Sequence, residues 1–442
     1  MLQRFLEFIQ QQHLFPSGQE VLLAVSGGRD SVAMLDLCRR AGIPFAVAHC
    51  NFHLRPGDCD RDQQFVRRLA AAIGVAFHTV DFDTRAYAAA NGMGIEEAAR
   101  HLRYSWFDSL CRQHGYACVA TAHHRDDSVE TFFLNLLRGT GIAGLHGIRP
   151  SSSFLHTTLV RPLLCCSRAD IDRYVDERHL AYVEDYTNAQ LDARRNQLRH
   201  RLMPLLRELC PSFDTTMEAN LQRLAEVHEV YSNAVSDLRD RMLRSEKSPF
   251  GFPYAWMALD AIRTLSPRRT LLFELLRPYG FSPAVVDDIL AALHTEHTGT
   301  LFVSDTHAAA FDRGRLILTE NNLHTLPEVT SECGEWKTEM GKRNENEALR
   351  LVEYIDADTV RLPLSVRHWQ PGDRFQPLGM EHQRRLSDFL KDGKLNLFEK
   401  RCVGVLTDAD GRIVWVVGLR LDHRVRVSPS TQRVLRLSAT IR

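Results

Sequence analysis

Short apolar runs alternate with helical patterns through the first two hundred residues. The runs are rich in Val, Ala and Phe, as in buried strands, and they cover residues 21–25, 45–49, 76–80 and 117–121. Between them, apolar residues recur at intervals of three and four, which predicts helices over residues 30–39, 63–73, 95–111 and 126–137. Strands alternating with helices of this length predict a doubly wound parallel sheet. Such sheets bind ligands at the carboxyl ends of their strands.

The pattern changes in the second half of the chain. A basic helical stretch at 194–209 is followed by long helical periodicity over 214–244. Segment 322–350 is polar and acid-rich with little periodicity, and short β-type runs such as 413–417 and 434–437 come after it. We therefore predict an α/β N-terminal domain, a mainly helical central domain, a linker and a small α+β C-terminal domain. Their predicted bounds are 1–212, 213–321, 322–350 and 351–442.

Composition narrows the class of protein. The 442 residues are 44% apolar and 25% charged, which is typical of a globular protein and excludes a disordered, collagen-like or small disulfide-rich chain. None of the ten cysteines forms a C-x-x-C pair, and the N-terminus lacks the basic start and apolar run of a secretory signal. These features predict reduced thiols, a cytoplasmic location and no membrane partner.

The zero net charge hides an uneven distribution. Residues 361–442 contain 16 basic and 8 acidic side chains, whereas the whole chain has 55 of each. A basic module on a neutral chain favours a polyanionic partner, and nucleic acid is the first choice. A solvated basic face remains the alternative.

The strongest motif is Ser-Gly-Gly-Arg-Asp-Ser at residues 26–31. It follows an apolar strand and opens a helix, where glycines let the backbone approach an anion and unpaired N–H groups carry partial positive charge. No Gly-Lys-Ser/Thr follows, so this is a phosphate cradle without the Walker A lysine. Asp30 is suited to holding Mg²⁺ against bound phosphates.

A second cluster follows the fourth predicted strand. Asp127 and Glu130 are three residues apart and share a helix face, where they can bind an ammonium group or a metal. His123 and His124 precede them, but their spacing fits no common zinc site. An ordinary capped helix with acids in its first turn is the alternative.

Arginines form the third group of candidates. Arg100 and Arg103 lie about one helical turn apart and can neutralise phosphate or transition-state charge, or simply face solvent. Residues 194–201 form a dense basic helix that can follow a nucleic-acid backbone. A similar basic cluster with interleaved aromatic residues lies in the C-terminal module, around Arg374.

Together these motifs resemble the PP-loop ATP-pyrophosphatase superfamily, whose fold is of the adenine nucleotide alpha hydrolase type. Within it, the chain resembles the tRNA-isoleucine lysidine synthetases. Phe52, His53 and Ser128 differ from that family's usual residues. The resemblance rests on residues 26–31, 49–55, 96–104, 123–131, 138–147, 161–164 and 194–204, on Glu184, Asp185 and Asn188, and more weakly on Arg367, residues 371–374, Trp415 and Gly418.

The resemblance implies a reaction. ATP adenylates the wobble cytidine of an isoleucine tRNA with a CAU anticodon, and free L-lysine then displaces AMP to form lysidine, so that the tRNA reads AUA rather than AUG. ATP and Mg²⁺ are the implied cofactors, and a homodimer is possible. The implied catalytic residues are Asp30, Arg103, Asp127 and Glu130, with Asp30 the metal ligand. The implied nucleotide-binding residues are Ser26, Gly27, Gly28, Arg29, Asp30, Ser31, His49, Asn51 and His124. The implied lysine- or tRNA-binding residues are Asp127, Glu130, Arg194, Arg195, Arg199 and Arg374.

Three alternatives remain open from the sequence. A PP-loop tRNA thiolase needs cysteines for sulfur transfer. This chain has no C-x-x-C motif, and the adjacent Cys165 and Cys166 are a poor substitute for one. An amidotransferase with an N-terminal nucleophile needs a cysteine after Met1, where Leu2 stands. A non-catalytic tRNA-binding protein would not need the complete cradle. Lysine-dependent release of pyrophosphate distinguishes a lysidine synthetase from all three alternatives.

Overall fold

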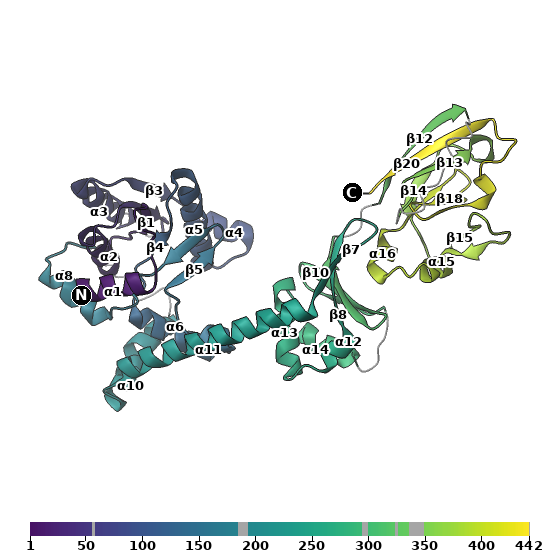
Figure 1. The fold of residues 1–442 in the computed structure, drawn as a ribbon. Coiled ribbons are helices and arrows are strands. Elements are labelled where there is room, and N and C mark those ends of the chain that lie inside the picture. Colours follow the sequence, from purple (N-terminus) through teal and green to yellow (C-terminus); the bar gives the residue numbers. More distant parts are fainter. Residues whose placement is uncertain (55–57, 184–192, 294–298, 323–325, 336–348, 442) are drawn as a thin grey trace. The chain divides into compact units, whose positions relative to one another are not determined.

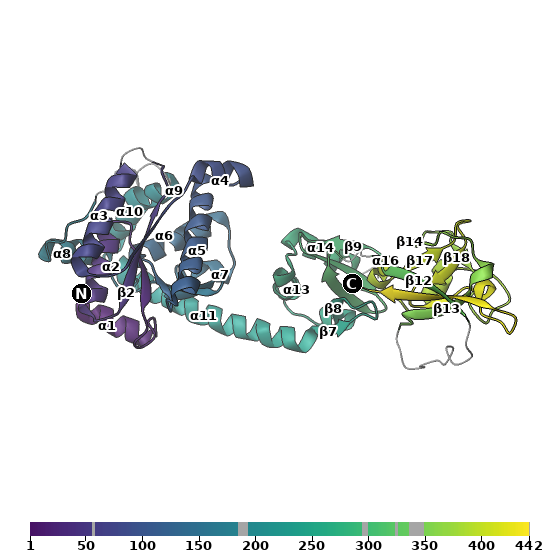
Figure 2. The same ribbon diagram turned by 90° about the horizontal axis from the view of Figure 1, so that it is seen from above.

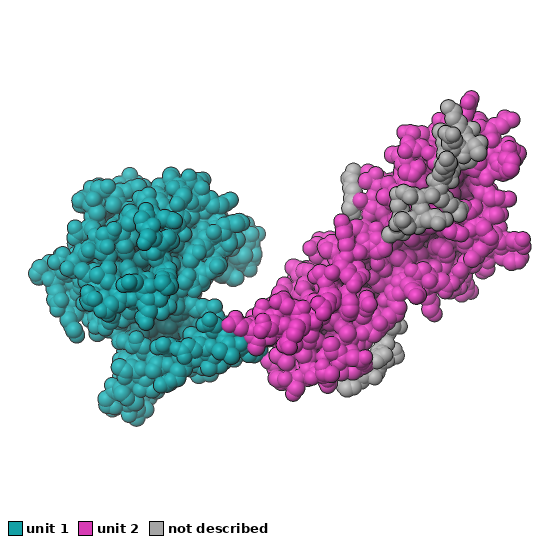
Figure 3. Space-filling view, in the orientation of Figure 1, with its two compact units in different colours: residues 1–231 teal, residues 232–442 magenta. Residues whose placement is uncertain are grey.

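The computed structural model describes residues 1–54, 58–183, 193–293, 299–322, 326–335 and 349–441. Two compact units divide the chain, residues 1–231 and 232–442 (Figure 3). The candidate residues Glu184, Asp185 and Asn188 lie outside the described residues, as does Arg55 of segment 49–55. No helix among the described residues is long and apolar enough to cross a membrane.

The first unit is built on a six-stranded sheet in the order β3-β2-β1-β4-β6-β5. All neighbouring pairs are parallel except β5 with β6, which form an antiparallel hairpin at one edge. The predicted α/β class with a parallel sheet is therefore confirmed. The strands are β1 (Val21–Ala24), β2 (Phe45–Asn51), β3 (Phe77–Asp81), β4 (Val119–Ala120), β5 (Ser151–Phe154) and β6 (Thr157–Val160).

Helices cover both faces of this sheet (Figures 1 and 2). Successive residues of β1 point to opposite faces, so Leu23 packs in the core under α2 and α3, whereas Leu22 packs under α5. Both faces are apolar, which explains why the buried strands are continuous apolar runs rather than alternating ones. The helices are α1 (Leu2–Gln11), α2 (Arg29–Arg40), α3 (Asp58–Ile73), α4 (Thr84–Asn91), α5 (Ile95–His114), α6 (Arg125–Arg138), α7 (Ile142–Leu145) and α8 (Arg168–Glu177).

The predicted basic helix at 194–209 is interrupted by a π-helical turn. It consists of α9 (Ala193–Gln197), the π turn η2 (Leu198–Leu202) and α10 (Met203–Leu209). The long helix α11 (Phe213–Met242) follows, as its periodicity predicts. In the first unit, Met203 packs with Phe213 and Met217 against Val129 of α6, which fixes the basic helix beside the sheet's carboxyl edge.

The second unit begins with the end of α11 and a five-stranded antiparallel sheet in the order β7-β8-β11-β10-β9. The predicted helices of this region are present, but the sheet was not anticipated. The strands are β7 (Arg244–Lys247), β8 (Pro253–Ala258), β9 (Leu301–Val303), β10 (His307–Asp312) and β11 (Arg315–Glu320), and the helices are α12 (Leu259–Arg263), α13 (Arg268–Leu276), η3 (Arg277–Tyr279) and α14 (Pro283–Ala292).

The C-terminal part contains three small sheets, β12-β20-β13, β14-β17-β18-β19 and β15-β16. Segment 322–350 differs from the expected irregular linker, since residues 328–335 form a strand paired with β20. The elements are β12 (Glu328–Glu335), β13 (Val352–Asp356), η5 (Ala357–Thr359), β14 (Ser365–His368), β15 (Arg374–Phe375), β16 (Arg384–Arg385), α15 (Leu386–Asp392), α16 (Leu397–Cys402), β17 (Gly404–Thr407), β18 (Ile413–Val416), β19 (Arg420–Leu421), η6 (His423–Val425) and β20 (Arg433–Thr440).

Candidate active site

The glycine-rich loop connects β1 to α2 at the carboxyl edge of the sheet. Gly27 has φ +95°, a conformation that favours glycine, and a Cβ added there would lie 3.3 Å from Val66 Cγ2, which is a tight contact. Gly28 is the residue before the first turn of α2. The Gly27 N–H donates to Ser31 Oγ at 3.2 Å and the Gly28 N–H to Ser26 Oγ at 3.3 Å. The loop thus forms a tight turn between strand and helix, and the N–H groups of its two glycines donate to neighbouring serine hydroxyls.

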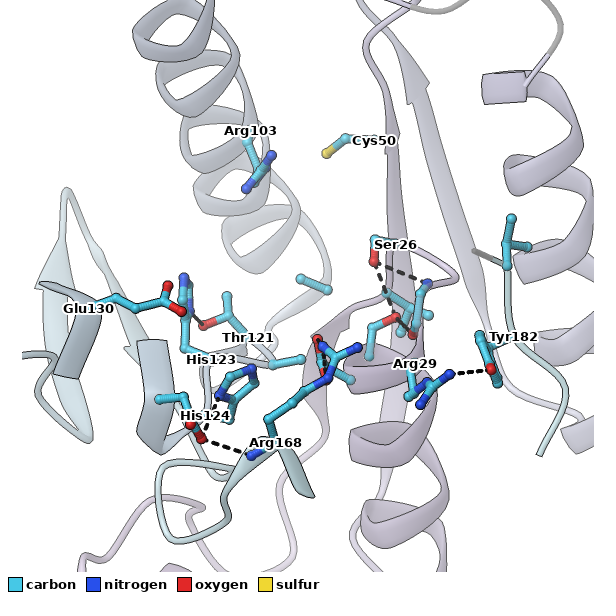
Figure 4. Close-up of a pocket in the computed structure, with 18 of the residues that line it drawn as sticks. Ser26, Arg29, Cys50, Arg103, Thr121, His123, His124, Glu130, Arg168 and Tyr182 are labelled. Carbon is cyan, nitrogen blue, oxygen red and sulfur yellow. Dashed lines mark hydrogen bonds and ion pairs between the residues drawn. The ribbon is translucent and has the colours of Figure 1, made fainter. Parts of the chain in front are cut away.

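A cavity of about 760 Å³ opens in front of this loop. Its lining comes from several parts of the first unit: the cradle, the end of β2, α3, α5, the segment after β4, α6, and the helices α8 to α10 with the residues that follow α8. Figure 4 shows Ser26, Arg103, His123 and Glu130 around it. This volume is within the ordinary range for a pocket that binds a small molecule or cofactor.

Asp30 faces this cavity from the first turn of α2. Both of its carboxylate oxygens accept hydrogen bonds from Arg168 Nη1, at 3.0 and 2.9 Å. Burial raises the pKa of Asp30, although His124 and Arg168 act in the opposite direction. Within the described ranges there is no group of three or more His, Cys, Asp or Glu side chains able to hold a metal. One carboxylate beside a phosphate cradle nevertheless fits Mg²⁺, which usually takes one or two carboxylates plus phosphate and water oxygens.

The acidic pair on α6 is brought together as predicted, but both members have partners. Glu130 is 1% exposed, and its oxygens accept from Arg199 Nε at 2.7 Å, Arg195 Nε at 2.9 Å and Arg199 Nη2 at 3.0 Å. Asp127 accepts from the backbone N–H of His124 at 3.0 Å and lies 3.6 Å from Arg199 Nη2. Nearby His124 and His123 hold the pKa of Asp127 below its usual range, against the opposing effect of burial.

Arg103 reaches the cavity from α5. Its guanidinium carbon lies 5.1 Å from the centre of the Phe52 ring. Within the part of the chain that the structure describes, it forms neither a hydrogen bond nor an ion pair. A cation stacked on an aromatic ring and facing a cavity keeps its N–H groups available for an anion.

Histidines line the segment between β4 and α6. His123 shares a hydrogen bond of 3.0 Å with Thr121 Oγ1, and burial lowers its pKa to about 4, so the ring is neutral at pH 7. His124 is 3% exposed and lies 3.5 Å from Asp127. Both rings line the cavity, so His124 is in position to contact a ligand there.

Other predicted nucleotide-binding residues point elsewhere. His49 Nδ1 bonds to the carbonyl of Val25 at 2.9 Å, and buried Asn51 donates to Asp60 and Gln63, so both side chains brace the sheet edge beside the cavity. Arg29 lines the cavity but pairs with Asp172 at 2.7 Å and stacks on Tyr182. His49 and Asn51 thus lie outside the lining of the cavity, whereas Arg29 is part of it.

The predicted basic contacts divide between the two units. Arg194 is exposed on α9, whereas Arg195 and Arg199 point to Glu130. Arg374 is exposed on β15 in the second unit.

Sequence reasoning missed Arg168, Arg207 and Tyr182, which also line the cavity. Arg168 is the first residue of α8, directly after Ser167, which caps that helix together with Asp170. That Ser-x-x-Asp pattern is visible in the sequence and marks the helix start, but it does not reveal which ligand edge the helix approaches.

Three family models match successive parts of the chain. The PP-loop domain matches residues 1–206, the TilS substrate binding domain residues 254–321 and the TilS substrate C-terminal domain residues 364–438. The cradle and the parallel sheet lie within the first match. The first unit is therefore a PP-loop domain.

Curated relatives extend the match over the full chain. A tRNA(Ile)-lysidine synthase of Parabacteroides distasonis is 38% identical over 97% of both chains, and that of Bacteroides thetaiotaomicron is 37% identical over 98% of both. A third, from Porphyromonas gingivalis, is 34% identical over 95% of this chain and 94% of its own. The chain belongs to the tRNA(Ile)-lysidine synthase family and is an enzyme of that class.

Proposed function

We propose that this enzyme joins free L-lysine to C2 of the wobble cytidine of an isoleucine tRNA with the anticodon CAU. ATP is cleaved to AMP and pyrophosphate, and the product tRNA reads AUA instead of AUG. One observation carries the proposal beyond family membership. One cavity is lined by an anion cradle, by Arg103, which forms no hydrogen bond with the described residues, and by Glu130 of the α6 acidic pair.

The first step is adenylation of the base. The O2 atom of cytidine attacks the α-phosphorus of ATP, and the bond to the leaving pyrophosphate breaks. The N–H groups at the N-terminus of α2 bind phosphate oxygens, and those of Gly27 and Gly28 join them by exchanging their serine hydroxyl partners for phosphate. Asp30 would hold Mg²⁺, which would supply positive charge against the phosphates. Arg103 donates to the oxygen on which charge develops during the transfer.

The second step is attack by lysine. Its ε-amine must be neutral to attack C2, and the departing group is AMP. Asp127 and Glu130 bind the ammonium groups of lysine, and one of them takes the proton that the amine loses. Asp127 is the better acceptor of that proton, because both oxygens of Glu130 already accept from Arg195 and Arg199.

The remaining basic side chains are proposed to bind tRNA or lysine. We assign this role to Arg194, Arg195, Arg199 and Arg374, and recognition of an unstacked anticodon base fits the usual route to RNA specificity. We retain the domain bounds 1–212, 213–321 and 351–442 for the catalytic, substrate-binding and basic tRNA-binding parts. A homodimer is part of the same proposal.

The test is incorporation of radiolabelled lysine into unmodified isoleucine tRNA bearing CAU, with ATP and Mg²⁺. A methionine tRNA with the same anticodon is the control. Label in the isoleucine tRNA alone is the expected result. Cleavage of ATP without label would contradict the proposal and favour another PP-loop modification such as thiolation. For the metal assignment, Asp30→Asn should slow pyrophosphate release, and a rate equal to wild type would remove Asp30 from the mechanism.

A further inference from the structure

Arg168 joins three helices at the edge of the nucleotide cavity. Its Nη1 contacts both carboxylate oxygens of Asp30 on α2, and its Nε lies 3.2 Å from Asp172 on α8. Its backbone N–H donates to Asp126 on α6 at 2.8 Å. The side chain is nevertheless 44% exposed and lines the cavity.

The contact with Asp30 occupies the place where a metal or phosphate would act. A guanidinium that bonds to both oxygens of a carboxylate blocks their use as metal ligands. With a polyphosphate in the cavity, Asp30 would hold the accompanying Mg²⁺, and the guanidinium of Arg168 would bond to a phosphate oxygen instead of to Asp30. Planar guanidinium groups match phosphate oxygens in charge and geometry.

The other arginine at the cradle is less available. Arg29 pairs with Asp172 and stacks on Tyr182, and its side chain is only 23% exposed. For Arg168, the contacts of Nε and of the backbone N–H hold the stem in place, so exchange of the Nη1 contact needs only the end of the side chain to move. Arg168 is therefore the better placed of the two to meet a phosphate chain.

We propose that Arg168 is a phosphate-binding residue for the leaving pyrophosphate, which exchanges Asp30 for an oxygen of the β- or γ-phosphate when ATP and Mg²⁺ bind. The inference rests on the proposed function and names a further residue of the same site. Arg168 then contacts the β- and γ-phosphates, which leave as pyrophosphate, and not the AMP part of the nucleotide. No covalent step is involved.

The test compares nucleotide affinities of the full chain by titration calorimetry, without tRNA or lysine. In Arg168→Gln, ATP with Mg²⁺ should bind about 10- to 100-fold more weakly, as expected for loss of a hydrogen bond to a charged group. Inorganic pyrophosphate should weaken similarly, whereas AMP affinity should stay within about twofold. Arg168→Lys, which keeps the charge but loses the fork, should fall between wild type and Arg168→Gln.

Arg178→Gln is the matched control. Arg178 follows α8 and lies 3.7 Å from Asp36 of α2, so it joins the same two helices, and its side chain is 43% exposed. It does not line the cavity. Its substitution should leave ATP and AMP affinities unchanged.

Two results would overturn the inference alone. If Arg168→Gln binds ATP as wild type does, the exchange does not occur. If ATP and AMP weaken equally, Arg168 is a structural link between helices. Failure of wild type to bind ATP at all would refute the proposed function and the inference with it. Should Arg168→Gln lose helical content by circular dichroism, Arg168→Lys decides by the same comparison of ATP with AMP.

Discussion

Glu130 provides the sharpest test of how the acidic pair is held. Three guanidinium N–H groups donate to its oxygens at 2.7–3.0 Å, and the carboxylate is almost completely buried. Breaking a fully buried ion pair costs about 3–5 kcal/mol. Arg195 and Arg199 are 31% and 39% exposed, so water compensates part of the loss, and glutamine keeps one acceptor oxygen. We therefore expect Glu130→Gln to destabilise the first unit by about 2 kcal/mol.

Hydrogen exchange of the full chain, read by mass spectrometry, measures this locally. Peptides from α6 and from residues 193–209 report the free energy of opening around Glu130 and its two arginines. Glu218→Gln is the matched control, since Glu218 pairs with Arg125 at the same 2.7 Å but is 49% exposed. An exposed pair contributes about 0.5 kcal/mol or less, so the control should hardly change.

The comparison of the two substitutions decides the matter. Equal and small effects for Glu130→Gln and Glu218→Gln would mean that the buried pair is not formed in solution. In that case Glu130 could take the proton from lysine, and the preference for Asp127 as proton acceptor would lose its support.

Three further results are expected. Gly27→Ala should weaken ATP binding, measured by calorimetry, at least about tenfold, because φ is +95° and Val66 is close. Gly18→Ala is the control, since Gly18 also has a positive φ but lies in open space, and it should leave ATP binding unchanged. Equal ATP affinities of the two variants would contradict the cradle geometry. Arg103→Gln should slow tRNA-dependent AMP formation about 100-fold, whereas Arg100→Gln should hardly change that rate. If the rate changes as little in Arg103→Gln as in Arg100→Gln, Arg103 does not stabilise the developing charge. Because the pKa of His123 is about 4 when folded and about 6.5 when unfolded, the unfolded chain binds the proton first as the pH falls. In urea unfolding, this group should lower the free energy of unfolding by about 2 kcal/mol at pH 5 relative to pH 8. The difference between the two pH values should be smaller in His123→Gln. A difference of the same size in that variant would show that His123 is not its cause.

The first unit was predictable because its signals are local. Each buried strand is a continuous apolar run, and the turn at Gly27 has a positive φ of +95°, which is a local reason for glycine. Asp30, Asp127 and Glu130 follow strands of one parallel sheet, so the sequence correctly predicts that they gather at one edge.

Other features depend on distant partners and left no local signal. Strand β12 is almost wholly exposed, so it lacks apolar alternation, and its pairing partner β20 lies about a hundred residues away. The hairpin strand β5 is mostly serine. The partners of Glu130 are 65 and 69 residues distant, and a run of arginines does not say which carboxylate it will meet.

The π turn η2 has a consequence for insertions and deletions. Such turns are usually single-residue expansions of an α-helix. Deleting one residue within Leu198–Leu202 would restore ordinary helical geometry and rotate the two flanking segments by about 100° relative to each other. If Met203, after the turn, kept its buried position, Arg195, before the turn, could no longer reach Glu130. The length of this segment, and not only its composition, is therefore under constraint, and functional relatives should tolerate substitutions there more readily than gaps.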